Sequence, residues 1–252
     1  MAARFPAHRI GGLLTAAFLA LVAGCGGPPA PATGVAASPP ASGSPAGSAA
    51  AEASGSTPAA ATAAPEDFAE ALPAPLRRAM TGVSWRPGCP AGLDDLRLLH
   101  VSYVDFDGRV EQGQLVVNAA IAPATLRVFA RLRQARFPIR SMNLIERYGG
   151  SDDASMAADN TSAFNCRNVP GTSHWSNHAY GRAVDVNTVE NPYLPAGQVM
   201  PPAGQAYLDR RDVRPGMIVA GDPTVRAFAA EGFSWGGSWR NGTDYQHFEK
   251  PA

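Results

Sequence analysis

The stretch SNHAYGRAVDVN occupies residues 176–187 and carries the chemistry around which the rest of the chain can be interpreted. Within it, His178 and Asp185 are seven positions apart, and Gly181 lies between them. Glycine adopts backbone conformations that other residues avoid, so Gly181 permits a sharp reversal of the chain. Such a reversal would let the imidazole and the carboxylate converge on one point, as metal ligands do.

A second segment near the C-terminus, DYQHFE at residues 244–249, supplies another histidine and another carboxylate. A catalytic zinc site has three protein ligands and leaves one position for water, and imidazole and carboxylate both suit zinc. We therefore expect His178, Asp185 and His247 to bind Zn²⁺, and Asp244 to act as the general base toward water. Imidazole suits several transition metals, so ligand identity alone does not fix the metal.

These two segments together resemble a known family. The pattern SxHxxGxAxD at 176–185, followed by DxxHFE at 244–249, is similar to VanY-type D-alanyl-D-alanine carboxypeptidases and L-alanyl-D-glutamate peptidases, which are zinc peptidases with a hedgehog-like fold. The segments AFNCR, NPY and WGGSW extend the resemblance over most of the chain after about residue 140. The resemblance implies a small α+β domain with a central antiparallel sheet, one zinc ion and peptidoglycan stem peptides as substrates.

The resemblance assigns the same three metal ligands and the same base, and it adds one further residue. Family members carry an arginine on a strand shortly before the first ligand, and Arg167 is the matching candidate. Its guanidinium would stabilise the substrate oxyanion or bind a terminal carboxylate. The alternative is a surface or structural arginine. Many relatives have glutamate where this chain has Asp244, which leaves the reach of the base open.

Two other functional classes remain open at this stage. Cys166 could be the nucleophile of a Cys-His hydrolase, although secretion and the presence of Cys89 favour a disulfide between the two. A wall-binding module that has lost catalysis is the other class, and the complete ligand set argues against it. His174 is expected not to bind the metal, and Trp235 and Trp239 could line a groove or pack in the core.

The first residues of the chain predict a secretory signal peptide followed by a disordered linker. Arg4 and Arg9 precede a short apolar run that ends in LVAGC, which resembles a bacterial lipobox. We therefore expect residues 1–24 to be a lipoprotein signal peptide and Cys25 to carry the lipid. Residues 25–66 contain mostly small residues and proline and are expected to be a disordered linker, so that 67–252 form the peptidase domain.

Several local patterns predict secondary structure in that domain. Segments rich in Val, Leu, Tyr and Phe predict strands. Segments in which apolar residues recur with helical spacing, or that begin with a helix-capping residue, predict helices. The expected strands are 96–106, 113–121, 141–148, 162–167 and 182–187; the expected helices are 123–136 and 222–232, the latter with Asp222 as N-cap, and 68–80 is an amphipathic stretch. Irregular mixing of helices and strands favours an α+β fold.

Charge excludes one class of partner. The chain has 21 basic and 21 acidic residues and shows no basic patch, so no nucleic-acid partner is expected. The predicted partners are peptidoglycan peptides, and a membrane reached through the lipid on Cys25. We expect an extracytoplasmic monomer anchored to the bacterial cell membrane.

Overall fold

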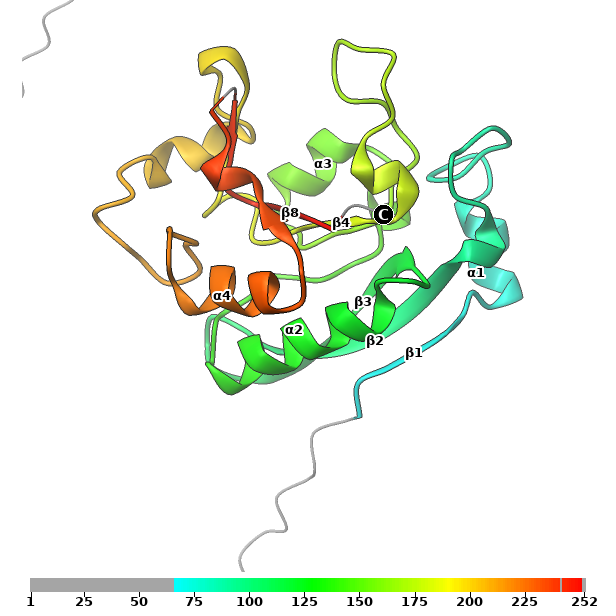
Figure 1. Cartoon of the computed structure of the whole chain (residues 1–252), viewed down its shortest axis with the longest axis horizontal. Coiled ribbons are helices and arrows are strands. Elements are labelled where there is room, and N and C mark those ends of the chain that lie inside the picture. Colours follow the sequence, from blue (N-terminus) through cyan, green and yellow to red (C-terminus); the bar gives the residue numbers. More distant parts are fainter. Residues whose placement is uncertain (1–65, 241, 251–252) are drawn as a thin grey trace, which may run out of the picture. The chain divides into compact units, whose positions relative to one another are not determined.

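The computed structural model describes residues 66–240 and 242–250. The predicted signal peptide, the predicted lipid attachment site Cys25 and almost all of the predicted linker lie outside the described residues. Within the described part the chain is α+β with antiparallel sheets (Figure 1), so the predicted fold class is confirmed. No helix in this part combines the length and apolar character needed to cross a membrane.

The first sheet is a three-stranded antiparallel sheet in the order β1-β2-β3. Its strands are β1 (Phe68–Ala71), β2 (Leu96–Val104) and β3 (Val110–Asn118). The predicted Asp107-Gly108 turn joins β2 to β3, and Gly108 has the positive φ of +81° that favours glycine there. Two of the predicted strands are therefore confirmed, with β2 ending two residues earlier than expected and β3 shifted by three residues toward the N-terminus.

The second sheet carries the ends of the two signature segments. It has the order β4-β8-β6 and consists of β4 (Ala183–Asp185), β8 (His247–Glu249) and β6 (Ser234–Trp235). A separate two-stranded antiparallel sheet consists of β5 (Tyr193–Leu194) and β7 (Thr243–Asp244).

A short extended segment connects the two three-stranded sheets. Ser162 exchanges backbone hydrogen bonds with Asp185 of β4 at 2.9 and 3.0 Å, and Phe164 N–H donates to Val116 O of β3 at 3.0 Å. The segment thus bonds to an edge strand of each sheet. It explains how the long β2–β3 hairpin supports the small sheet that holds the signature residues.

Helices pack against this framework. The α-helices are α1 (Ala74–Met80), α2 (Ala122–Gln134), α3 (Asp152–Ala157) and α4 (Pro223–Ala230). Short 3₁₀ turns cover Leu93–Asp95, Ile145–Tyr148, Asn177–Tyr180, Pro195–Gly197, Pro202–Tyr207 and Gly236–Ser238. Asp222 caps α4 by accepting from Val225 N–H at 2.8 Å, as predicted.

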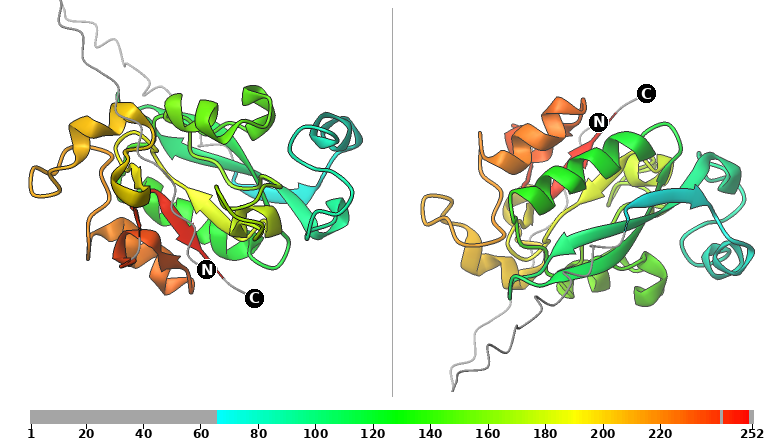
Figure 2. Two further views of the ribbon diagram at one scale, coloured as in Figure 1. Left: turned by 90° about the horizontal axis from the view of Figure 1, so that it is seen from above. Right: turned by 90° about the horizontal axis from the view of Figure 1, so that it is seen from below.

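Alternation along β2 and β3 divides the core into two clusters, because successive strand residues point to opposite faces. One face packs against α2, α4 and the second sheet (Figures 1 and 2), through residues that include Leu99, Val101, Leu115, Val117, Phe129, Val184, Phe228 and Phe248. The other face packs against α1 and the segment that follows Phe164, through Leu96, Leu98, Val116, Met80 and Cys166. The rings of Phe228 and Phe248 stack at 3.8 Å and anchor β8 to α4.

Three local predictions differ from the structure. Residues 68–80 divide at Pro73 into a strand and a helix, because 68–71 pair with β2. Residues 141–148 form no strand: Met142 makes one bridge, and 145–148 form a 3₁₀ turn that ends at Gly149 with φ +62°. Residues 162–167 make a single isolated bridge, between Ser162 and Asp185, rather than a regular strand.

Candidate metal centre and its pocket

Strand pairing and one tight turn bring the predicted ligands together. Asp185 ends β4 and His247 begins β8, and the antiparallel register places these two residues directly opposite each other. His178 lies in the turn 177–180, which Ser176 caps by accepting from His178 N–H at 3.3 Å. Gly181 then reverses the chain with φ +66°, and a Cβ there would lie 2.7 Å from Asn118 N. The predicted glycine turn is confirmed.

The three side chains converge with short, nearly equal separations. His178 Nε2 lies 3.1 Å from Asp185 Oδ2, His247 Nδ1 lies 3.0 Å from Asp185 Oδ1, and the two ring nitrogens are 3.2 Å apart. All three residues are buried, and their potential ligand atoms lie within 4.8 Å of one another. The structure therefore brings together the three residues that the sequence suggested.

The donor set and its spacing fit a tetrahedral metal ion. Ligand atoms about 2.0–2.1 Å from a zinc ion in tetrahedral geometry are about 3.3 Å from each other. The two imidazole nitrogens, 3.2 Å apart, are close to this value, and each of them lies 3.0–3.1 Å from a different oxygen of Asp185. His178 Nδ1 donates to Ala163 O at 2.5 Å, which leaves its Nε2 lone pair free to bind an ion.

The electrostatics of the group also favour a cation. Burial opposes ionisation of Asp185, but the neighbouring histidines His178 and His247 hold its pKa well below the ordinary value. Burial alone would lower the pKa of His247, yet its hydrogen bonds with Asp185 and Glu249 outweigh this effect and raise the pKa to about 10. Both effects show that the group stabilises positive charge between the rings, which is the condition for holding a metal cation.

Asp244, the predicted base, lies on β7 three residues before His247. The residue is partly exposed, but its Oδ1 is shielded from solvent and has no hydrogen-bond partner among the described residues. Burial is the main cause that raises the pKa of Asp244 to about 7; the charges of Asp185 and Asp152 act in the same direction, against that of His247. A shielded carboxylate oxygen beside a candidate metal group is available to bind a proton.

A cavity of about 170 Å³ opens onto these residues. Its lining includes His178, Asp185, His247 and Asp244, together with residues of α3 and of the loops at 167–177 and 193–200. The cavity therefore gives a small ligand access to both the candidate metal group and the candidate base.

Arg167 lines the same cavity, but its guanidinium already has a partner. Arg167 Nη2 lies 2.8 Å from Asp152 Oδ2 of α3, and its Nε is buried without a partner among the described residues. Burial raises the pKa of Asp152, and the positive charge of Arg167 opposes that rise. The expectation that Arg167 lies on a strand is wrong, because 162–167 form a single isolated bridge, which is made by Ser162.

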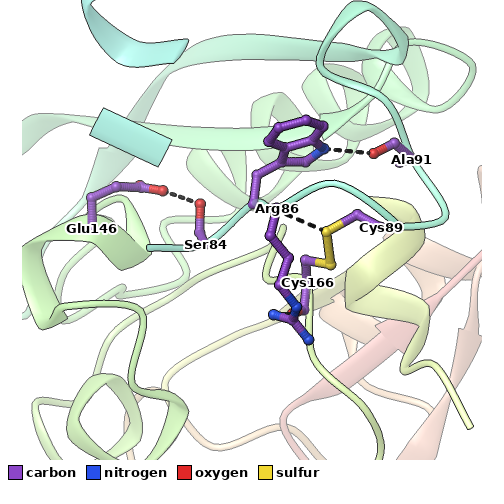
Figure 3. The surroundings of a disulfide bond; sticks show 7 residues. Ser84, Arg86, Cys89, Ala91, Glu146 and Cys166 are labelled. Carbon is purple, nitrogen blue, oxygen red and sulfur yellow. Dashed lines mark hydrogen bonds between the residues drawn. A yellow bond between two sulfur atoms is a disulfide. The ribbon is translucent and has the colours of Figure 1, made fainter. Parts of the chain in front are cut away.

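A disulfide fixes the residue before Arg167. Cys89 and Cys166 are bonded, with their Cα atoms 5.9 Å apart, as Figure 3 shows. Ser84 O accepts from Cys166 N–H at 2.9 Å, and Arg86 Nη1 donates to Cys166 O at the same distance. Cys166 has no free thiol in this structure, so the Cys-His hydrolase interpretation lacks its nucleophile.

The structure also separates residues that the sequence left undecided. His174 is exposed and belongs neither to the metal group nor to the cavity lining. Trp235 is buried in the core and donates from Nε1 to Tyr245 O at 2.9 Å. Trp239 instead lines the cavity with 38% of its surface exposed, and its ring centroid lies 5.2 Å from that of His247.

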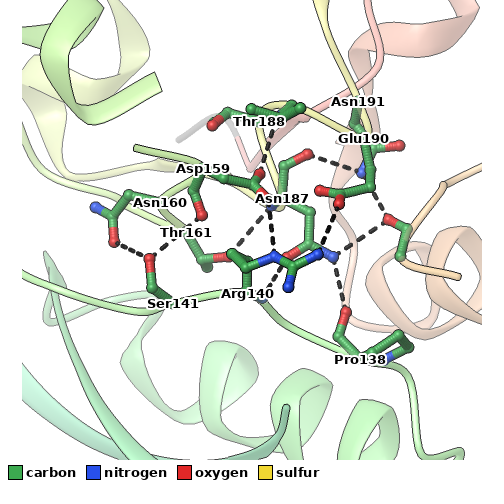
Figure 4. A network of polar contacts seen from close by, with 12 residues as sticks. Pro138, Arg140, Ser141, Asp159, Asn160, Thr161, Asn187, Thr188, Glu190 and Asn191 are labelled. Atoms are coloured by element: carbon green, nitrogen blue, oxygen red, sulfur yellow. Dashed lines mark hydrogen bonds and ion pairs between the residues drawn. The ribbon is translucent and has the colours of Figure 1, made fainter. Parts of the chain in front are cut away.

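A network of charged residues supports the loop that follows β4 (Figure 4). Arg140 lies 3.4 Å from both Asp159 Oδ2 and Glu190 Oε1, and Asp159 Oδ1 accepts from Val189 N–H at 2.8 Å. Asn187, with φ +46°, donates from its amide to Pro138 O at 2.7 Å. These contacts fix the chain just beyond Asp185.

Sequence reasoning missed several residues of the site. Asp152 gives no local signal, because its pairing with Arg167 spans 15 positions. Glu249 could have been found: it lies two residues after His247 on a strand, and therefore on the same face. Asn177 contacts Glu249 across 72 positions, with Nδ2 2.6 Å from Oε2.

Comparison with known proteins gives a match to the part of the chain that contains the candidate site. No curated protein and no solved structure gave a match. The resemblance to the hedgehog-like fold therefore stays a prediction. A family model described as D-alanyl-D-alanine carboxypeptidase matches residues 170–250, which include His178, Asp185, Asp244 and His247. The resemblance inferred from the sequence is thus confirmed for the segment that carries the site, since residues 170–250 match the model of a D-alanyl-D-alanine carboxypeptidase family.

Proposed function

We propose that this chain is a zinc-dependent peptidase that hydrolyses the stem peptides of peptidoglycan. The observation that carries the proposal is the convergence of His178, Asp185 and His247 beside Asp244 in one cavity, inside the segment matched by the peptidase family. Two imidazoles and one carboxylate are a donor set typical of catalytic zinc.

His178, Asp185 and His247 would hold the ion, and a zinc ion held there would supply Lewis acidity toward water and the scissile carbonyl. Asp244 has the role of general base: its carboxylate accepts the proton of the attacking water and returns it to the leaving amine. The partial exposure of Asp244 on the cavity wall gives water and substrate access to this carboxylate.

Arg167 is assigned to binding substrate oxygen. Its guanidinium lines the cavity, and the ion pair with Asp152 and the adjacent disulfide fix its position. A fixed guanidinium can donate to a carbonyl oxygen or to a terminal carboxylate. Which of these it binds distinguishes an endopeptidase from a carboxypeptidase.

The proposal includes an extracytoplasmic location and a lipid on Cys25. The lipobox-like sequence supports it, and the Cys89–Cys166 disulfide agrees with an oxidising compartment. A lipid anchor on Cys25 would hold the domain near its peptidoglycan substrate.

The test is digestion of purified muropeptides, read by mass spectrometry, with the zinc-loaded chain, the chelator-treated chain and the chain reloaded with zinc. We expect cleavage that the chelator abolishes and that zinc restores. Release of terminal alanine would identify a carboxypeptidase, and internal cleavage an endopeptidase.

Two variants assign the roles. His178→Ala should lose both zinc and cleavage, whereas Asp244→Asn should keep zinc and lose turnover by at least about 100-fold, as general-base removal does. Zinc binding without any cleavage would favour the non-catalytic wall-binding protein, and wild-type turnover in Asp244→Asn would refute Asp244 as the base.

A further inference from the structure

Glu249 makes contacts that the proposed reaction does not use. It ends β8, two residues after His247, so the two side chains extend from the same face of the strand. Glu249 Oε2 lies 3.1 Å from His247 Nε2, while His247 Nδ1 faces Asp185. The two nitrogens of this ring are thus directed to different partners.

We infer that Glu249 is a positioning residue that selects the tautomer in which His247 can bind a metal through Nδ1. This inference rests on the proposed function, because it assigns a role toward the ion held by His178, Asp185 and His247. It adds a residue outside the ligand set and names the ring nitrogen on which it acts.

The hydrogen bond between His247 and Glu249 fixes which ring nitrogen carries the hydrogen. A neutral imidazole has one N–H and one lone pair, and an ionised carboxylate only accepts. In the neutral ring that metal binding requires, accepting from His247 therefore places the hydrogen on Nε2 and leaves the lone pair on Nδ1, 3.2 Å from His178 Nε2. Carboxylates commonly orient metal-binding histidines in this way.

The two histidines require opposite tautomers, and each has its own acceptor. His178 donates from Nδ1 to the backbone oxygen of Ala163, which leaves Nε2 for the metal. His247 donates from Nε2 to a side chain, Glu249, which leaves Nδ1. A substitution can remove the second acceptor but not the first, so the role of Glu249 can be tested.

Asn177 fixes Glu249 in place. Its Nδ2 donates to the same Oε2 at 2.6 Å, so Glu249 Oε2 accepts from both Asn177 and His247. Asn177 directly precedes His178, so this contact joins the two segments that carry the histidines. Glu249 also lines the cavity, and a role in binding substrate is the alternative that an experiment must separate.

The experiment compares zinc affinity, measured by competition with a chromogenic chelator, in the full chain and in Glu249→Ala, Glu249→Gln and Asp153→Asn. Asp153 is an exposed acid on the cavity rim that has no role in the proposed site, so its variant is the matched control for lost negative charge. Melting of each metal-free protein reports whether the fold is retained.

We expect Glu249→Ala to weaken zinc binding by about 10- to 100-fold, the usual effect of removing such a partner. Glu249→Gln should lose less, because its carbonyl oxygen can still accept from Nε2–H, and Asp153→Asn should stay within about twofold of wild type. In ¹⁵N NMR of the zinc-loaded chain, the His247 Nε2–H signal should be protected from exchange in the wild type and lose that protection in Glu249→Ala.

Three outcomes would overturn the inference. A Glu249→Ala protein that binds zinc as tightly as wild type but turns over substrate more slowly would make Glu249 a substrate contact. Equal losses of zinc affinity in Glu249→Ala and Asp153→Asn would show that Glu249 acts only through its negative charge and not through its contact with His247. A folded wild-type chain that takes up no zinc would refute the proposed function and this inference together.

Discussion

Replacing Glu190 by glutamine should change how the stability of this protein depends on pH. Glu190 lies in the network behind the site, with 1% of its side chain exposed, 3.4 Å from Arg140. Burial, followed by the hydrogen bond and charge of Asp159, raises the pKa of Glu190 from 4.5 to about 7. Glutamine has nearly the same shape and cannot ionise.

Whether stability rises or falls with pH depends on how many protons Glu190 binds in the folded and in the unfolded protein. Between pH 4.5 and about 7 the folded protein holds a proton on Glu190 that the unfolded chain has released. Stability therefore falls as pH rises through this window and levels off above it. At about 1.4 kcal/mol for each tenfold change in proton affinity, the full difference is about 3 kcal/mol.

Urea unfolding at pH 5 and pH 8 measures this quantity. At pH 5 the variant and the wild type should have similar free energies of unfolding. At pH 8 the variant should be more stable by up to about 3 kcal/mol, the value that the pKa of Glu190 implies. Glu111→Gln, an exposed substitution on β3 that removes one carboxylate, is the matched control. An equal stability difference between Glu190→Gln and wild type at both pH values would refute the reasoning.

Two further predictions concern the cavity. Trp239→Ala should raise KM for a stem peptide about tenfold, with little change in kcat, because the exposed ring on the cavity wall contacts substrate rather than reacting atoms; Trp239→Phe should recover most of the loss, and an unchanged KM would exclude the contact. Replacing Cys89 and Cys166 together by serine should lower the free energy of unfolding by about 4 kcal/mol in urea without reductant, because the bond closes a loop across 77 positions. The same double variant should weaken substrate binding through Arg167, and an unaltered KM would separate the disulfide from that role.

The candidate ligands could be predicted from the sequence because their information is local. His178 and Asp185 share one motif with Gly181, and His247 belongs to a second motif. The helices 122–134 and 223–230 were also predictable, from apolar spacing and from the Asp222 cap. In each case neighbouring residues carry the whole signal.

The features that were missed depend on contacts between distant residues. Residues 141–148 have an apolar content that suits a strand, but the side chain of Asn160 captures the backbone N–H of Asn143 at 2.9 Å and ends the extended run. Arg167 was identified as a site residue, yet its partner Asp152 lies on a six-residue helix that gave no pattern of its own. Glu249 was visible in its motif, and only its distance from His247 shows what it contacts.

The pairing of β4 with β8 has a consequence for how this protein can diversify. Asp185 and His247 are 62 positions apart in the sequence, but their separation in space is set by three paired residues on each strand. The chain between them includes β5, β7 and Trp239, which form part of the cavity wall. Insertions or deletions in 195–200, which end at the cavity-lining Met200, would therefore reshape the substrate side of the cavity while the strand register keeps the two ligands opposite each other. Related proteins with different substrates could differ most between these two residues and least at them.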